Sequence, residues 1–276
     1  MSDDLADEPT GPTALAEARP TDAAARPLDA VLLAGGRASR LDGASKPELE
    51  VGGRTLLSLA IDAARRAGAR TVVVVGPPAL SAPGCLVVRE EPPFGGPVAA
   101  IAAGLAALDP ARSDAPSDVL VLACDLPQAP DAVDRVLAGR ARHIAADGVC
   151  LVDVDGRTQW LTAIYARAAL DTALGALDGG PDGAAMRHLV GGLDLVEVAD
   201  GGTGADVDTW PDLERARERA RERPRRGPAP GADGGTRTAG RGGTDSRSDT
   251  DTNTDTGTDT DTGTDTDTDT DTEERA

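Results

Sequence analysis

The chain has 276 residues and a formal net charge of −19, from 47 acidic and 28 basic side chains. This acidic balance argues against a protein whose main task is to bind nucleic acid or an anionic membrane surface. No apolar run approaches the roughly 18–20 residues that span a bilayer, and the acidic N-terminus lacks the apolar core of a secretory signal. Three cysteines without metal-ligand spacing favour neither a disulfide framework nor a zinc site, so we expect a cytoplasmic protein.

Composition divides the chain into three parts. Residues 1–27 are rich in Pro, Ala, Asp and Thr without periodicity, and residues 224–276 pass into Thr-Asp repeats. Alternating Asp and Thr cannot bury an apolar face and their charges repel, so both ends are expected to be disordered. The segment 28–223 is long enough for one domain with a core of its own.

Strand and helix patterns alternate along that middle segment. Fully apolar or alternating runs predict strands, and apolar residues at helical spacing predict helices between them. The predicted strands are 28–33, 71–75, 86–88, 118–123, 149–154, 159–165 and 193–198, with Asp155-Gly156 as a hairpin turn. The predicted helices are 54–67, 97–108, 130–138, 167–177, 184–190 and 209–221.

This alternation predicts a single three-layer α/β domain of Rossmann-like type with a mostly parallel sheet, because apolar strands separated by helices are covered on both faces. Ligands of such folds bind at the carboxyl ends of the strands. We therefore expect functional residues just after Leu33, Val88 and Ala123.

The first of these places holds LLAGGRASRLDGASKPELEVGGRTLL, residues 32–57. Gly35 and Gly36 allow close approach of the backbone to a ligand, and Arg37, Arg40 and Lys46 supply positive charge, which together suit a triphosphate. Lys46 is the single lysine beside 27 arginines. The segment matches neither the P-loop nor the dinucleotide fingerprint. The alternative is a flexible Gly/Arg surface loop.

The second and third places follow later strands. In VREEPPFGGPVAAIAAGL, residues 88–105, Gly96 and Pro97 begin a helix whose free N–H groups face the crevice, with Glu90 or Glu91 before it. In LVLACDLPQAP, residues 120–130, Asp125 follows a buried strand, where a carboxylate could hold Mg²⁺. The alternatives are a plain helix cap and an Asp that starts a turn.

Together these motifs resemble the nucleotidyltransferase family that includes molybdenum cofactor guanylyltransferase, the MobA-like NTP transferases, over about residues 28–215. The resemblance rests on L-A-G-G-x-x-x-R-L, K-P, V-G-G-R-T-L-L, G-P-V-A-A and C-D-x-P. It implies a nucleotide site formed by Leu33, Ala34, Gly35, Gly36, Arg37, Lys46, Glu90, Gly96 and Pro97. It also implies Lys46, Arg40 and Asp125 as the catalytic group, with the two cations on the triphosphate and Asp125 on the metal.

Two further matches complete the resemblance. Asp206 and Asp208, in GADVDTWPDLERAR, stand where the family has an Asn or Asp pair, which makes Asp208 a candidate second metal ligand, although Asp208 or Thr209 is also a good N-cap for the last helix. QWLTAIY and AAMRHLV match acceptor-binding segments, with Gln159, Trp160 and Arg187 as candidates.

The resemblance implies Mg²⁺-dependent transfer of an NMP, GMP from GTP above all, onto a phosphate of a small acceptor such as molybdopterin, with release of pyrophosphate. Other proteins of cofactor biosynthesis or molybdoenzyme maturation are possible partners, but no nucleic acid or membrane. The alternatives are a cytidylyltransferase or sugar-1-phosphate nucleotidyltransferase of the same fold, and a nucleotide-binding carrier without catalysis. All enzyme hypotheses require that Lys46 and Asp125 meet across one cleft.

Overall fold

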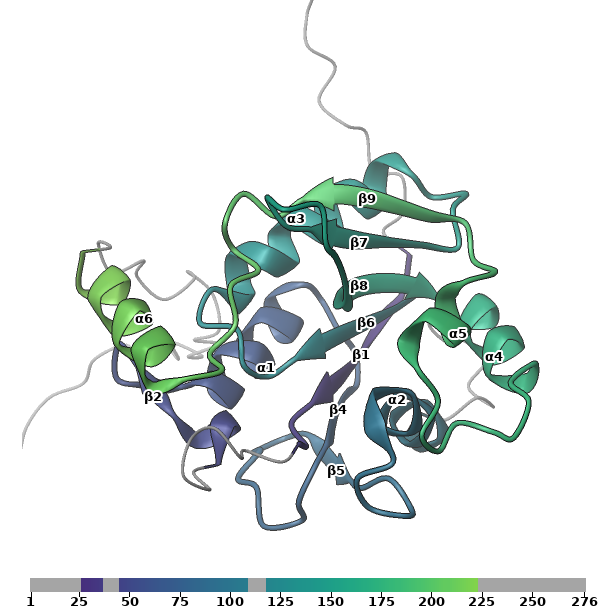
Figure 1. Ribbon diagram of the computed structural model, residues 1–276, viewed down its shortest axis with the longest axis horizontal. Helices are drawn as coiled ribbons and strands as arrows, with labels where there is room; N and C mark the ends of the chain where they lie inside the picture. The colour runs from purple at the N-terminus through teal and green to yellow at the C-terminus, as the bar shows by residue number, and fades with distance from the viewer. Residues whose placement is uncertain (1–25, 37–44, 109–117, 223–276) are drawn as a thin grey trace, which may run out of the picture. The chain divides into compact units, whose positions relative to one another are not determined.

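The computed structural model describes residues 26–36, 45–108 and 118–222. Their main feature is a seven-stranded sheet (Figure 1). In spatial order its strands are β5 (Leu86–Val88), β4 (Val72–Val75), β1 (Leu28–Leu33), β6 (Asp118–Ala123), β8 (Thr158–Ala166), β7 (Gly148–Val152) and β9 (Leu195–Ala199). The expected disordered segments, residues 1–27 and 224–276, lie outside this description except for residues 26 and 27.

The sheet is mostly parallel. β1 pairs in parallel with β4 and β6, β4 with β5, and β7 with β9. β8 is antiparallel to both β6 and β7, and it is the one reversed strand in the described sheet. The carboxyl ends of β5, β4, β1 and β6 therefore meet at one edge, which is the edge where the sequence analysis expects ligands.

Helices cover both faces of the sheet, as Figure 1 shows. Ala30 and Leu32 of β1 pack with α1 (Leu56–Arg66) and α3 (Ala129–Arg142) on one face. Val31 packs on the other face with α2 (Gly96–Ala107), α4 (Arg167–Gly175) and α5 (Met186–Val190). Because alternate residues of a strand point to opposite faces, a run of buried apolar residues serves two cores and the predicted three-layer α/β fold is confirmed.

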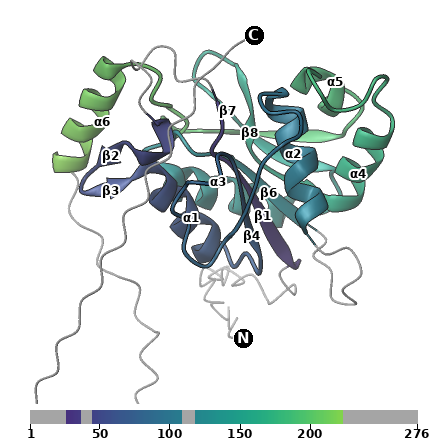
Figure 2. The ribbon, with the colours of Figure 1, turned by 90° about the horizontal axis from the view of Figure 1, so that it is seen from below.

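A third, smaller core joins the final helix α6 (Trp210–Glu222) to a two-stranded hairpin of β2 (Glu50–Val51) and β3 (Arg54–Thr55). Its buried members are Val51, Leu56, Val207, Leu213 and Ala216. Figure 2 shows α6 beside this hairpin. The short core matters because it holds together segments that are more than 150 residues apart in sequence.

The hairpin is a correction to the expected elements. The apolar spacing predicts a helix from Arg54, but Arg54 and Thr55 form β3. Helix α1 begins at Leu56, with Thr55 Oγ1 accepting the Ser58 N–H at 3.1 Å. Gly52 and Gly53 both have positive φ, +62° and +77°, which a two-residue hairpin turn of this type requires. The short 3₁₀ helix Lys46–Glu48 was also not predicted.

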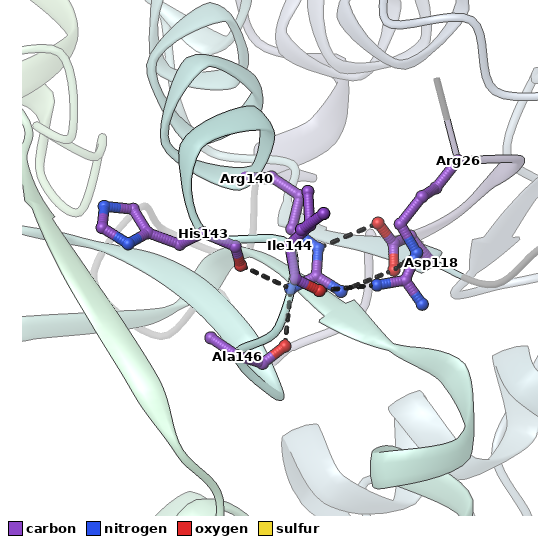
Figure 3. A network of polar contacts seen from close by, with 6 residues as sticks. All are labelled: Arg26, Asp118, Arg140, His143, Ile144 and Ala146. Atoms are coloured by element: carbon purple, nitrogen blue, oxygen red, sulfur yellow. Dashed lines mark hydrogen bonds and ion pairs between the residues drawn. The ribbon is translucent and has the colours of Figure 1, made fainter. Parts of the chain in front are cut away.

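At the opposite, amino edge of the sheet, a buried ion pair ties α3 to β6 (Figure 3). Arg140 donates to both carboxylate oxygens of Asp118 at 2.9 and 2.8 Å, and also to the carbonyls of Ala146 and His143. Arg26 reaches the same carboxylate at 3.5 Å and donates to the Ile144 carbonyl. No helix among the described residues is long and apolar enough to cross a membrane.

Candidate active site

A cavity of about 380 Å³ opens at the carboxyl edge of the parallel strands. It is lined by residues at the ends of β1 and β6, by residues that follow β1, β5 and β6, by the start of α2 and by one residue of β8. These are Leu33, Gly35, Gly36, Glu90, Phe94, Gly96, Pro97, Ala100, Ala123, Asp125 and Leu161. The segments after Leu33, Val88 and Ala123, where functional residues are expected, thus line one cavity, and their function stays a prediction.

The glycine loop after β1 is held by backbone bonds to both neighbouring strands. The Ala34 N–H donates to the Val75 carbonyl at 2.8 Å, and the Cys124 N–H donates to the Leu33 carbonyl at 3.0 Å. Gly36 has φ +140°, a conformation that residues with a side chain rarely adopt. Ala34 itself is buried and does not line the cavity. The candidate cations Arg37 and Arg40 lie outside the described residues.

Three carboxylates meet beside this cavity. One oxygen from each of Asp125, Asp206 and Asp208 lies within 4.8 Å of the others. Asp125 stands two residues after β6, and its carbonyl accepts the Val207 N–H at 3.0 Å. Val207 is fully buried in the third core. The burial of Val207 anchors this segment in the third core, and the carboxylates of the residues on either side of it reach Asp125.

Lys46 supplies the positive charge at this cluster. Its Nζ donates to Asp208 Oδ1 and lies 3.8 Å from Asp125 Oδ2. The lysine begins the 3₁₀ helix Lys46–Glu48, whose Pro47 is buried, and the Leu56 N–H donates to the Leu49 carbonyl just after it. The side chains of Lys46 and Asp125 are 24% and 26% exposed, so they meet each other while a ligand can still reach them.

Three carboxylates face one ammonium group at this cluster, and burial and these charges together shift the pKa values of the acids. Burial raises the pKa of Asp125 to about 6, Lys46 opposes the rise, and the charges of Asp206 and Asp208 add to it. Burial and the Asp208 charge likewise raise the pKa of Asp206. Carboxylate oxygens are the ligands that Mg²⁺ and Mn²⁺ prefer. The donor set therefore fits a hard divalent cation, whose charge would favour the ionised form of all three acids.

Thr209, which the sequence offered beside Asp208 as an N-cap of the last helix, caps α6. Thr209 N–H and Thr209 Oγ1 both donate to Asp212 Oδ2, at 2.8 and 2.6 Å, while the Asp212 N–H faces Thr209 Oγ1 at 3.4 Å. This reciprocal pair is a capping box for α6. Because Thr209 and Asp212 form the cap, Asp208 can point to Lys46.

The start of α2 forms another wall of the cavity. Gly96 and Pro97 are its first residues, as expected for Pro at a first helical position, and Gly96 has φ +90°. Of the two candidate glutamates, Glu90 is buried and lines the cavity, whereas Glu91 is exposed. Glu90 Oε1 accepts the N–H of Phe94 at 3.1 Å. Phe94, in the same loop, is exposed, and no pattern in the sequence predicted this exposure.

The three acceptor candidates lie in two places. β8 pairs Thr162 with Leu122, so Gln159 and Trp160 continue toward the edge that carries Asp125. Gln159 Nε2 lies 3.4 Å from Asp153 Oδ2, and the Trp160 carbonyl accepts the Tyr165 hydroxyl at 2.8 Å. Arg187 is exposed on α5 and does not line the cavity. The structure thus brings two of the three toward the site edge.

Comparison with known proteins agrees with this geometry. The family model described as the MobA-like NTP transferase domain matches residues 30–195. The chain belongs to the MobA-like NTP transferase family. As a member it is a nucleotidyltransferase whose substrates include a nucleoside triphosphate. It is 33% identical over 170 residues to the molybdenum cofactor guanylyltransferase of Rhodopseudomonas palustris (strain BisB5), covering 51% of this chain and 81% of that relative.

Solved structures of this MobA-like protein's relatives share its fold. Rv0371c from Mycobacterium tuberculosis H37Rv is 27% identical with a TM-score of 0.53, covering 70% of this chain and 99% of that one. Molybdopterin-guanine dinucleotide biosynthesis protein A from Archaeoglobus fulgidus is 18% identical with a TM-score of 0.52, covering 71% and 100%. A manganese complex of Rv0371c also matches, at 22% identity, a TM-score of 0.50, and coverage of 70% and 98%.

Proposed function

We propose that the protein transfers GMP from GTP to a phosphate of molybdopterin or the molybdenum cofactor, and that pyrophosphate is the second product. The observation that carries the reaction type is the meeting of Lys46 with Asp125 and Asp208 beside a cavity lined by Gly35 and Gly36. The proposed base and acceptor are supported by the name of the Rhodopseudomonas palustris relative.

The reaction is a single in-line displacement. An oxygen of the acceptor phosphate forms a bond to the α-phosphorus, and the bond from that phosphorus to the bridging oxygen of the β-phosphate breaks. Pyrophosphate leaves with the electron pair, so no covalent enzyme intermediate is needed. The protein's contribution is to position both reactants and to stabilise the charge that develops.

Each named residue has a part in that scheme. Leu33, Gly35, Gly36 and the start of α2 at Gly96 and Pro97 line the nucleotide cavity. Lys46 stabilises the departing pyrophosphate. Arg37 and Arg40 remain predicted phosphate ligands from the sequence alone.

Asp125 and Asp208 would hold the metal, which we propose to be Mg²⁺, and Asp206 is the third carboxylate of the cluster. A divalent cation bound there would supply positive charge against the phosphate oxygens. The protein prepares this by holding Asp125 through the backbone bond from Val207 and by keeping Thr209 rather than Asp208 as the helix cap. Burial raises the pKa of the Cys124 thiol, so the neighbouring cysteine stays protonated and is no nucleophile.

The proposal is tested by measuring pyrophosphate release with GTP, CTP, ATP and UTP in turn, each with molybdopterin or a sugar 1-phosphate and with or without Mg²⁺. We expect Mg²⁺-dependent release with GTP and molybdopterin. Release with CTP would make the protein a cytidylyltransferase, and release with a sugar 1-phosphate would change the acceptor class. Tight nucleotide binding without turnover in any pairing would support the carrier hypothesis instead.

A further inference from the structure

The loop between β5 and α2 carries an unusual aromatic residue, Phe94. Its φ is +69°, and it is the one residue other than glycine with positive φ in the described part of the chain. Bulky side chains avoid this region, and residues held there cost about 1–3 kcal/mol and cluster at functional sites. The protein nevertheless places its only phenylalanine at this position.

The surroundings of Phe94 maintain this conformation. The buried carboxylate of Glu90 accepts the Phe94 N–H at 3.1 Å. The next residue, Gly95, accepts the Gly183 N–H on its carbonyl at 2.8 Å, and a side chain there would collide with Asp182 and Ala99. The loop is therefore held on both sides of the aromatic residue.

The aromatic ring is presented rather than buried. Phe94 is 54% exposed, whereas Tyr165 is completely buried, and Phe94 lines the same cavity as Gly35 and Asp125. The Arg89 guanidinium lies 5.2 Å from the ring centroid, within cation–π range. A strained, exposed aromatic residue at a cavity wall suits a flat ligand that stacks on the ring.

The order of the strands in the sheet indicates which end of a bound nucleotide would contact Phe94. β5 is three strands from β6, a separation of about 14 Å at the usual strand spacing. Asp125, beside which the proposed function places the reacting phosphate, follows the end of β6. β8, with its acceptor candidates, lies on the far side of β6 from β5. If the reacting phosphate of a nucleotide lies beside Asp125 and the nucleotide extends along this edge toward the loop after β5, its base lies at that loop.

We propose that Phe94 is a stacking platform for the nucleobase of the bound nucleoside triphosphate, and that Glu90 is the positioning residue that holds it. This inference rests on the proposed function, because it requires that the cavity takes a nucleotide. Base–aromatic stacking contributes enough that its removal weakens binding by about 5- to 150-fold.

The test compares the protein with its Phe94→Gly and Phe94→Tyr variants, using GTP and tripolyphosphate as titrants. Glycine relieves the backbone strain, so we expect Phe94→Gly to unfold at an equal or higher temperature. We expect that variant to lose GTP affinity by about tenfold or more, to keep tripolyphosphate affinity, and to show a raised KM for GTP with little change in kcat. Phe94→Tyr keeps an aromatic ring at this position, so we expect it to bind GTP as the parent protein does.

Four outcomes would overturn the inference. Phe94→Gly could bind GTP as the parent protein does, or lose GTP and tripolyphosphate equally. It could unfold at a lower temperature with a matching loss of binding, which would indicate a packing role. A raised KM for the acceptor alone would mean that the ring contacts the acceptor. If the parent protein binds no NTP at all, the proposed function fails together with this inference.

The role of Glu90 is tested with Glu90→Gln and Glu90→Ala. The glutamine keeps an oxygen that can accept the Phe94 N–H, so we expect near-parental GTP affinity. The alanine releases the loop, and we expect it to lose GTP but not tripolyphosphate affinity. If Glu90→Gln loses as much GTP affinity as Glu90→Ala, the carboxylate acts on the nucleotide directly and the positioning role is wrong.

Discussion

Strand β6 has an aspartate at each end, and the two are in opposite electrostatic situations. Asp118, at its start, is 4% exposed and accepts bonds from Arg140 with both carboxylate oxygens. Asp125, just past its end, faces two further acids and one lysine. Buried charges are stable when they are paired and hydrogen-bonded. The amino edge of the sheet thus holds a completed ion pair, whereas the carboxyl edge has more carboxylates than cations among the described residues.

The largest expected effect comes from breaking the completed pair. Arg140→Met leaves the Asp118 carboxylate buried with only the more distant Arg26, and it removes the donor to the Ala146 and His143 carbonyls. We expect the free energy of unfolding to fall by about 3–5 kcal/mol in denaturant titrations. The folded fraction should keep its specific activity.

The control for this pair is the double variant Asp118→Asn/Arg140→Met, which removes the orphaned charge and should recover part of the loss. A single variant as stable as the parent protein would show that the pair contributes nothing. A folded single variant with greatly reduced turnover would show that the two edges are coupled.

The next largest effect is expected at the incomplete edge. Lys46→Ala should reduce turnover by about 10²–10³-fold, the usual loss when one charge-stabilising donor is removed. Circular dichroism should show an unchanged fold, because the side chain is partly exposed. Arg54→Ala is a matched control, since it removes a nearby exposed cation that binds Asp62. Near-normal turnover of Lys46→Ala would contradict the assigned role.

A smaller effect concerns stability and pH. The ordinary pKa of an Asp is 3.8, and that of Asp125 is about 6 in the folded protein. The folded state therefore keeps the Asp125 proton to a higher pH than the unfolded state does. As pH rises between these two pKa values, the ionisation of Asp125 lowers the free energy of unfolding. We expect Asp125→Asn to raise the free energy of unfolding at pH 8 by about 1–3 kcal/mol and to change it little at pH 4.

The same variant should lose its divalent cation and its turnover, which separates a functional charge from a structural one. Urea titrations at the two pH values without added metal give the measurement. If Asp125→Asn is destabilised at pH 8, the acid cluster contributes to folding and the contrast with Asp118 disappears.

The smallest expected effect concerns the affinity of the carboxylate cluster for a divalent cation when Lys46 is replaced. The Lys46 ammonium contacts the carboxylates that would bind the cation, so the two compete in the nucleotide-free protein. We expect Lys46→Met to tighten Mn²⁺ binding by about fivefold, the equivalent of about 1 kcal/mol for two charges 4 Å apart in water. Titration of the free Mn²⁺ paramagnetic signal measures this. Unchanged or weaker binding would show that Lys46 does not occupy the cation site.

The elements that the sequence predicted well are those with an unambiguous period. The predicted bounds of β1, β5 and β6 are identical to the observed ones. Their apolar runs stop within two residues of the end of each strand, at Gly35, Arg89 and Asp125. The β2–β3 hairpin was missed because its strands have two residues each. The glycine pair at 52 and 53 was the available signal, since an adjacent glycine pair is a common hairpin turn.

The candidate site divides in the same way. The family motifs marked Lys46 and Asp125 because the glycine loop and the strand-end aspartate are local patterns. The sequence marked Asp208 as the candidate second metal ligand, and Asp206 lies in the same cluster, because Val207 between them is anchored in a core that local sequence does not define. Phe94 gave no periodic or motif signal, since its backbone conformation and exposure depend on Glu90 and Gly183.

Sequence by itself determined the fold class and the family, because hydrophobic period and short glycine motifs are properties of neighbouring residues. Only the tertiary structure decided that Lys46 and Asp208 meet, 162 positions apart, and that one end of β6 is neutralised while the other is not. The physical reason is that charge balance depends on distances in space, and those are set by the packing of Val207, Leu213 and Leu56 in a core that no single segment contains.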